Sequence, residues 1–185
     1  MPASRRSGPL TFEDIKAAFA EFQDESDRAA AVLSLSLLDA QLEDILKAFS
    51  ADDTAIAELV KPDHPLGSFG SRRRICLSLG LISADEAAEL GILGKIRNEF
   101  AHNLHGLTFD TAPVDSWVQN LALPQRVFPR FRSFGRVRFS LSVGFVHLLL
   151  FCRLEAAQAA KRVAPAQAEI ALNPMSRDEF ERLSS

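Results

Sequence analysis

The sequence predicts an all-α fold: a single-domain bundle of about six to seven helices, with a long central helix and a long C-terminal helix. Apolar residues recur every three and four positions along most of the 185 residues. Helix-starting and helix-ending residues separate these stretches. A composition that is 47% hydrophobic supplies one well-filled core, and the length is short for two domains.

Domain boundaries follow from where the helical pattern begins and ends. We expect a disordered tail over residues 1–10, an all-helical domain over 11–162, and a loosely packed C-terminal tail over 163–185. Thr11 can cap a first short helix. Within the C-terminal tail, Ser176 and Glu179 can cap one short helix.

The central helix is predicted over about 24–49, where leucine and isoleucine recur at helical spacing. A shorter helix begins at Asp52 or Asp53 and stops before the prolines that follow Val60. The next helix covers about 68–79 and ends at Gly80, which can adopt the left-handed conformation that closes helices.

Ser83 and Glu86 form a capping box that begins the fifth helix, which ends near His102. Pro113 suits the first turn of another helix. The longest helix is predicted over about 136–162, apolar in its first half and alanine-rich in its second.

Arg97, Asn98 and His102 are the candidate catalytic residues. Asn98 and His102 lie one turn apart on one helix face, and the long side chain of Arg97 can reach that face. A cation, an amide and an imidazole together could bind an anion or cleave a phosphodiester. The alternative is that Asn98 and His102 hydrogen-bond a neighbouring helix while Arg97 pairs with a carboxylate. At the end of its helix, His102 is expected to be partly buried.

A basic stretch over 126–138 contains three phenylalanines, no acidic residue and five arginines: Arg126, Arg130, Arg132, Arg136 and Arg138. Single-stranded nucleic acid binds such mixtures through phosphate neutralisation and stacking, so RNA is a possible partner. Alternatively, the acidic residues of 1–71 compensate these arginines. That attraction acts within one protomer or across the homodimer that we expect. Compensation is the favoured alternative, and the question extends to the arginines of 72–74.

A helix-turn-helix spacing surrounds Gly80, but its second helix would enter a DNA groove with Asp85, Glu86 and Glu89 leading. Phosphate repulsion makes direct sequence-specific DNA binding unfavourable there. No residue pattern indicates a cofactor or a metal site, and His147 in an apolar helix is expected to be a hydrogen-bonded core residue.

Two cysteines, Cys76 and Cys152, lie within apolar helical patterns without a neighbouring thiol. We expect both to be buried and reduced, which indicates a cytoplasmic protein. The most hydrophobic run, 141–154, is shorter than the roughly 20 residues that a bilayer requires, so no membrane contact is expected.

Several segments, in order and spacing, resemble the mannitol operon repressor family over roughly residues 20–125. The likeness is carried by 28–33, 37–46, 65–71, 79–82 and 96–102. This resemblance implies a small, all-helical, non-enzymatic cytoplasmic regulator of sugar-alcohol uptake that acts through a protein partner. The 126–138 stretch has no counterpart that we match to the family, which leaves the operon and the partner open.

The segment Arg97-Asn-Glu-Phe-Ala-His102 also resembles the motif of HEPN helical domains, many of which are metal-independent RNases acting as dimers. By that resemblance His102 would serve as general acid or base, Arg97 would stabilise the charged phosphorane, and Asn98 would orient them. Ribonuclease or RNA-binding activity is therefore the alternative function, ranked below the regulatory one.

Overall fold

The computed structural model describes residues 25–103, 106–130, 132–165 and 181–182. Within these ranges all of its regular secondary structure is helical, as the sequence predicts. The expected tail over 1–10, the short helix capped by Thr11 and the cap at Ser176 lie outside the described residues.

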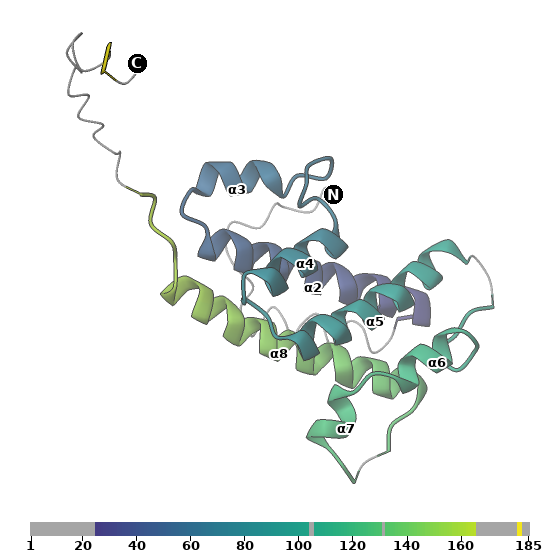
Figure 1. Cartoon of the computed structure of the whole chain (residues 1–185). Coiled ribbons are helices and arrows are strands. Elements are labelled where there is room, and N and C mark those ends of the chain that lie inside the picture. Colours follow the sequence, from purple (N-terminus) through teal and green to yellow (C-terminus); the bar gives the residue numbers. More distant parts are fainter. Residues whose placement is uncertain (1–24, 104–105, 131, 166–180, 183–185) are drawn as a thin grey trace.

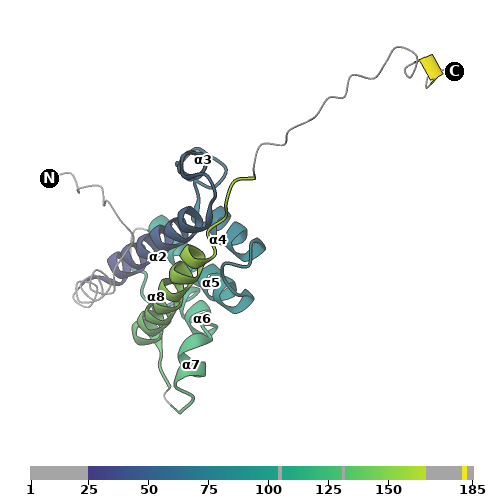
Figure 2. The same cartoon turned by 90° about the vertical axis from the view of Figure 1, so that its left-hand side faces the viewer.

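Two long helices and one intermediate helix form the centre of the bundle. They are α2 (Asp27–Phe49), α8 (Gly135–Ala159) and α5 (Ala84–His102). Figures 1 and 2 show α2 and α8 side by side with α5 packed against both. The shorter helices are α3 (Asp53–Leu59), α4 (Phe69–Ser78), α6 (Val114–Gln119) and α7 (Leu123–Val127).

Hydrogen bonds between residues far apart in the sequence show how the long helices run relative to one another. Arg136 reaches Asp27 at the start of α2, and the amide of Arg162 donates to Phe49 at its end, so α2 and α8 run parallel. Near its start, α5 contacts the later part of α8 through the Glu86 to Arg153 pair. The end of α5 lies beside the start of α2, so α5 runs antiparallel to both.

Local capping residues begin and end the helices where the sequence places them. Asp52 accepts from two amides at the start of α3, and Ser83 and Glu86 form the predicted capping box of α5. Gly80 has φ +71°, and the amide of Leu81 bonds back to the carbonyl of Cys76 at 2.8 Å, which closes α4.

The predicted boundaries differ from the structure at the start of α2, which begins at Asp27 rather than at residue 24, and in two further places. Helix α8 ends at Ala159 rather than at residue 162, and α7 was not predicted. A short helix of five residues carries too little periodicity to be recognised.

The core fills the space between α2, α5 and α8. Phe100, Phe109 and Phe139 are fully or almost fully buried, with ring centroids 4.9 Å apart for the first pair and 4.5 Å for the second. These rings join the end of α5 to the start of α8 through the segment before α6. Aromatic burial of this kind stabilises the region that carries the Arg97 to His102 motif.

Candidate functional site

The end of α5 presents Asn98 and His102 to solvent. Both side chains are exposed, and Arg97 beside them is half-buried. Within the described ranges none of the three makes a side-chain hydrogen bond or ion pair. The packing interpretation is therefore wrong for the part of the chain that the structure describes, because Asn98 and His102 bond to no neighbouring helix there. The sequence predicts partial burial of His102, and the structure places it among the exposed residues.

Two buried residues hold this face outward. Ile96 and Phe100 are both 0% exposed and anchor α5 in the core. Asn98 and His102 follow each of them by two positions, about 200° around the helix. The helix then ends with the amide of Asn103 bonded to the carbonyl of Glu99 at 3.0 Å. A rigid helix end therefore displays an amide and an imidazole, with a guanidinium to their side.

Two helices joined by a turn at Gly80 are present, as the spacing predicts, but the second helix, α5, packs inside the bundle. Glu86 and Glu89 are 3% and 2% exposed, so neither carboxylate faces outward as the sequence suggested. Only Asp85 of the three is exposed. The physical reason is that both buried carboxylates have donors from other helices.

Glu86 caps its own helix and binds α8. Its Oε2 accepts from the Ser83 amide at 2.6 Å, and its carboxylate accepts from the Arg153 guanidinium at 3.1 Å. This pair attaches the start of α5 to the later part of α8. A charged pair with one buried partner depends on its hydrogen bonds to offset desolvation.

Glu89 accepts three hydrogen bonds and has no cationic side chain bonded to it among the described residues. The donors are the amides of Ala122 (2.9 Å) and Leu123 (3.2 Å) and the hydroxyl of Ser142 (2.7 Å). The two amides stand at the start of α7, where helix N–H groups lack partners within the helix. Glu89 therefore positions α7 against α5 and α8.

The basic stretch over 126–138 divides into paired and unpaired arginines. Arg136 pairs with Asp27 at 3.1 Å, as compensation by the acidic N-terminal half predicts. Arg126 instead pairs with Asp85 at 2.7 Å on the surface, and Arg138 donates to the carbonyl of Leu121 at 2.7 Å. Compensation by residues 1–71 is thus confirmed for Arg136 and is wrong for Arg126 and Arg138.

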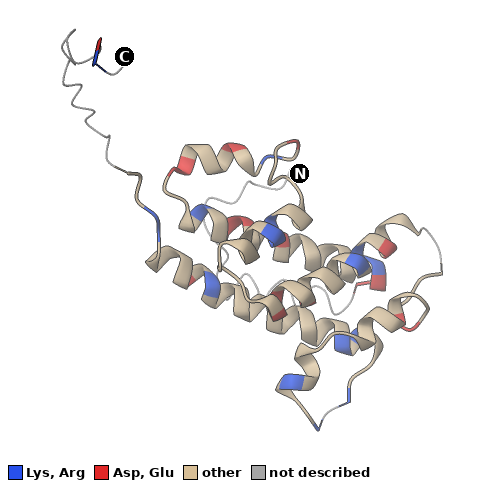
Figure 3. Cartoon of the chain, viewed as in Figure 1, with Lys and Arg blue, Asp and Glu red and all other residues tan. Residues whose placement is uncertain are grey.

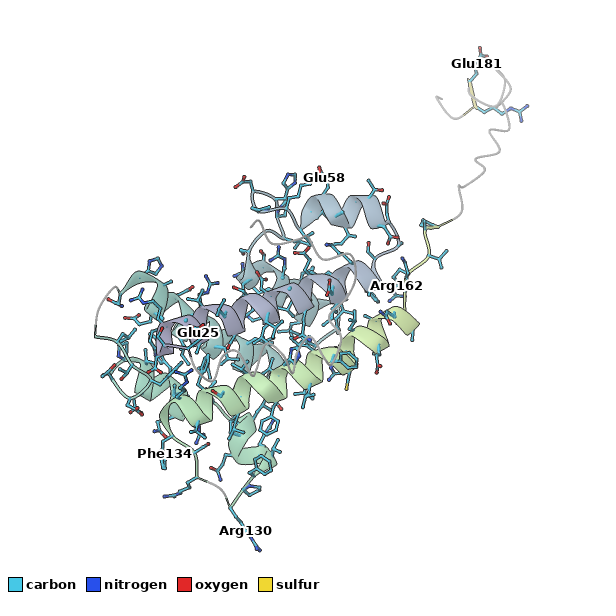
Figure 4. The ribbon with its side chains drawn as sticks, turned by 180° about the vertical axis from the view of Figure 1, so that it is seen from behind. Glu25, Glu58, Arg130, Phe134, Arg162 and Glu181 are labelled. Atoms are coloured by element: carbon cyan, nitrogen blue, oxygen red, sulfur yellow. The ribbon has the colours of Figure 1, made fainter. Side chains whose placement is uncertain are left out.

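Arg130 and Arg132 are exposed and have no side-chain partner among the residues described. Phe128 and Phe134 flank them with 46% and 56% of their surface exposed. Figure 3 shows only basic and uncharged residues in this projecting segment, and Figure 4 shows Arg130 at its tip. Phe131 lies outside the described residues. The segment combines free cations with exposed rings.

The arginines of 72–74 divide in the same way. Arg72 is buried and pairs with Asp39 at 2.7 Å and Glu43 at 3.0 Å. It stabilises the packing of α4 on α2. Arg73 donates to the carbonyl of Ala87 at 2.8 Å, whereas Arg74 is exposed.

His147 is a buried polar residue of the core, as predicted. Its Nδ1 donates to Gln41 Oε1 at 2.6 Å, and Gln41 Nε2 donates to the carbonyl of His147 at 3.3 Å. Burial lowers the pKa of His147 from 6.5 to about 4, so the ring is neutral at physiological pH. Across the described ranges no three His, Cys, Asp or Glu side chains gather as metal ligands.

The two cysteine thiols differ in their exposure to solvent. Cys76 is buried, and burial raises its pKa to about 12, which keeps it protonated and unreactive. Cys152 is exposed on α8, so the expectation that both thiols are buried is wrong.

Comparisons with known proteins give one structural likeness. No protein-family model matches the chain, and no curated protein matches it. Among solved structures, a chain in the X-ray structure of the MtlR-HPr complex from Escherichia coli superposes with a TM-score of 0.53 at 19% identity. The match covers 77% of this chain and 97% of that one. This likeness establishes the fold.

Proposed function

We propose that the protein is a non-enzymatic transcriptional regulator that acts by binding a protein partner rather than by reading DNA with a helix. The observation that carries the proposal is the burial of Glu86 and Glu89. The helix that the helix-turn-helix spacing would place in a groove is bonded inside the bundle. Reading bases would require breaking these contacts and would still bring carboxylates toward phosphate.

The kind of partner is inferred from the fold. The superposed structure contains MtlR, a mannitol operon regulator, in complex with HPr. The segments that resemble the mannitol operon repressor family lie within the described helical bundle. We infer a cytoplasmic regulator whose partner is HPr or a protein of that kind.

Selection of genomic duplex fragments by the purified protein tests the mode of action. At physiological salt we expect no enrichment of any operator sequence. Weak retention through Arg130 and Arg132 should be indifferent to sequence and should fall steeply with salt. Tight retention of one operator sequence at that salt would overturn the proposal.

Ribonuclease or RNA-binding activity is the second candidate, and the exposure of Asn98 and His102 favours it. A packed His102 could not reach RNA, whereas an exposed one can transfer a proton to or from a ribose hydroxyl. Arg97 beside it would stabilise the charged phosphorane, and Asn98 would orient the two groups.

Cleavage of RNA in the presence of a metal chelator tests this second function. We expect 2′,3′-cyclic phosphate ends and loss of activity in His102→Ala. The matched control is His64→Ala, which removes an exposed histidine from the turn before α4. Absence of cleavage, or equal cleavage by the His102 variant, would exclude the catalytic version.

A further inference from the structure

The chain between α7 and α8 carries arginines and phenylalanines on a projection from the bundle. We call it the arginine-phenylalanine tip; its members are Phe128, Arg130, Arg132 and Phe134. All four are exposed, the two rings by 46% and 56%. Figures 1 and 2 show this stretch projecting beyond α7, and Figure 4 places Arg130 at its end. Solvent therefore reaches both the cations and the rings.

The backbone of the tip directs a cation and a ring to the same side. Ser133 is 4% exposed, whereas its neighbours Arg132 and Phe134 are both exposed. Phe134 has the extended backbone angles φ −135° and ψ 167°. Side chains alternate along an extended chain, so residues two positions apart share a side and lie about 6.6 Å apart. A guanidinium and a phenyl ring therefore stand next to each other on the outward side.

Two acidic residues near the base of the tip are already paired with other arginines. On the α7 side Asp85 pairs with Arg126 at 2.7 Å, and on the α8 side Asp27 pairs with Arg136 at 3.1 Å. Among the residues described, no carboxylate pairs with either arginine of the tip. The surroundings are basic as well, because residues 126–162 contain eight arginines and lysines and one glutamate. The positive charge of the tip is therefore available to an external anion.

We propose that the arginine-phenylalanine tip binds single-stranded RNA. Its arginines contact phosphates, and its exposed rings stack on bases, which a single strand leaves free and a duplex does not. The alternation of cation and ring matches a ligand in which each phosphate is followed by a base. The proposal rests on RNA binding, which is the second candidate function, and it requires no cleavage at His102.

Two other anionic occupants fit the tip less well. A lipid bilayer takes up rings and leaves cations at its surface, but here Arg130 lies foremost among the described residues. Phe128 lies back against α8, with its ring 5.7 Å from that of Phe145. An acidic protein would need a contiguous contact of roughly 800 Å² on each side, which a short projecting loop does not provide.

Fluorescence anisotropy with a labelled oligouridylate of about twelve nucleotides tests the phosphate contacts. Arg132→Ala should raise the Kd about tenfold and lower the slope of log affinity against log salt by about 0.7. The matched control is Arg74→Ala, which removes an exposed arginine of α4 and should change neither quantity. Equal effects of the two variants, or no binding by the natural protein, would overturn the proposal. Tighter binding to an RNA duplex, an oligoglutamate peptide or phosphatidylglycerol vesicles would also overturn it.

Tryptophan fluorescence tests the stacking role of Phe134. Phe134→Trp keeps a stacking ring, and the oligouridylate should quench its emission more than that of the natural protein, whose single tryptophan is Trp117. Phe134→Ala should raise the Kd about tenfold, whereas Leu77→Ala, which truncates an exposed leucine of α4, should not. Equal quenching, or equal Kd values for the two alanine variants, would overturn the proposal. Lack of RNA cleavage would exclude the ribonuclease but not this binding site, which these variants test by themselves.

Discussion

The pair formed by His147 and Gln41 predicts a defined loss of stability in mild acid. His147 is 0% exposed, and burial lowers its pKa from 6.5 to about 4. Between these pH values the unfolded chain binds a proton that the folded protein does not. Stability is thus complete above pH 6.5 and falls as the pH approaches 4. Each unit of difference between the two pKa values is worth about 1.4 kcal/mol. The free energy of unfolding should therefore fall by about 3 kcal/mol.

Urea unfolding of the natural protein and of His147→Gln between pH 4 and 7.5 measures the contribution of His147 to the pH dependence of stability. Glutamine removes the titrating ring and keeps a polar side chain between α8 and α2. The difference in unfolding free energy between the two proteins should change by about 3 kcal/mol across the window. Equal pH dependence of the two proteins would refute the assignment of a buried, neutral His147.

Three substitutions test other contacts by thermal or urea unfolding. His102→Ala should change stability by less than about 0.5 kcal/mol, because the side chain is exposed; a larger loss would restore the packing interpretation. Glu89→Ala should cost about 3 kcal/mol, since it leaves the start of α7 and the Ser142 hydroxyl without their acceptor, and a neutral effect would contradict that role. Gly135→Ala should cost at least about 1–2 kcal/mol, because φ is +47° and the new Cβ would lie 2.2 Å from Asp110 Oδ1; unchanged stability would show that this turn relaxes.

The helices with local start and stop signals could be predicted from the sequence. Ser83 with Glu86, Asp52 and Gly80 act within a few residues of their own helix, so the sequence contains the whole interaction. Helix α7 could not be predicted, because its start depends on Glu89, more than thirty residues earlier in the chain. A contact of that kind is tertiary and leaves no local pattern.

The exposure of the candidate residues could be predicted in part from the sequence. The outward direction of Asn98 and His102 follows from the same helical periodicity that buries Ile96 and Phe100. The sequence therefore already indicated that these two side chains do not pack against a neighbouring helix. The burial of Glu89 had no such signal, because a glutamate on a helix is usually solvated. Only the fold brings its donors together.

Calorimetric titration of the purified protein with HPr from the same organism tests the central claim most directly. A regulator that works through this partner should give a saturable heat with one HPr bound per chain, and the signal should persist in His102→Ala, since catalysis plays no part in it. No binding heat at any HPr concentration, from a protein that is folded and of the expected oligomeric state, would contradict the account.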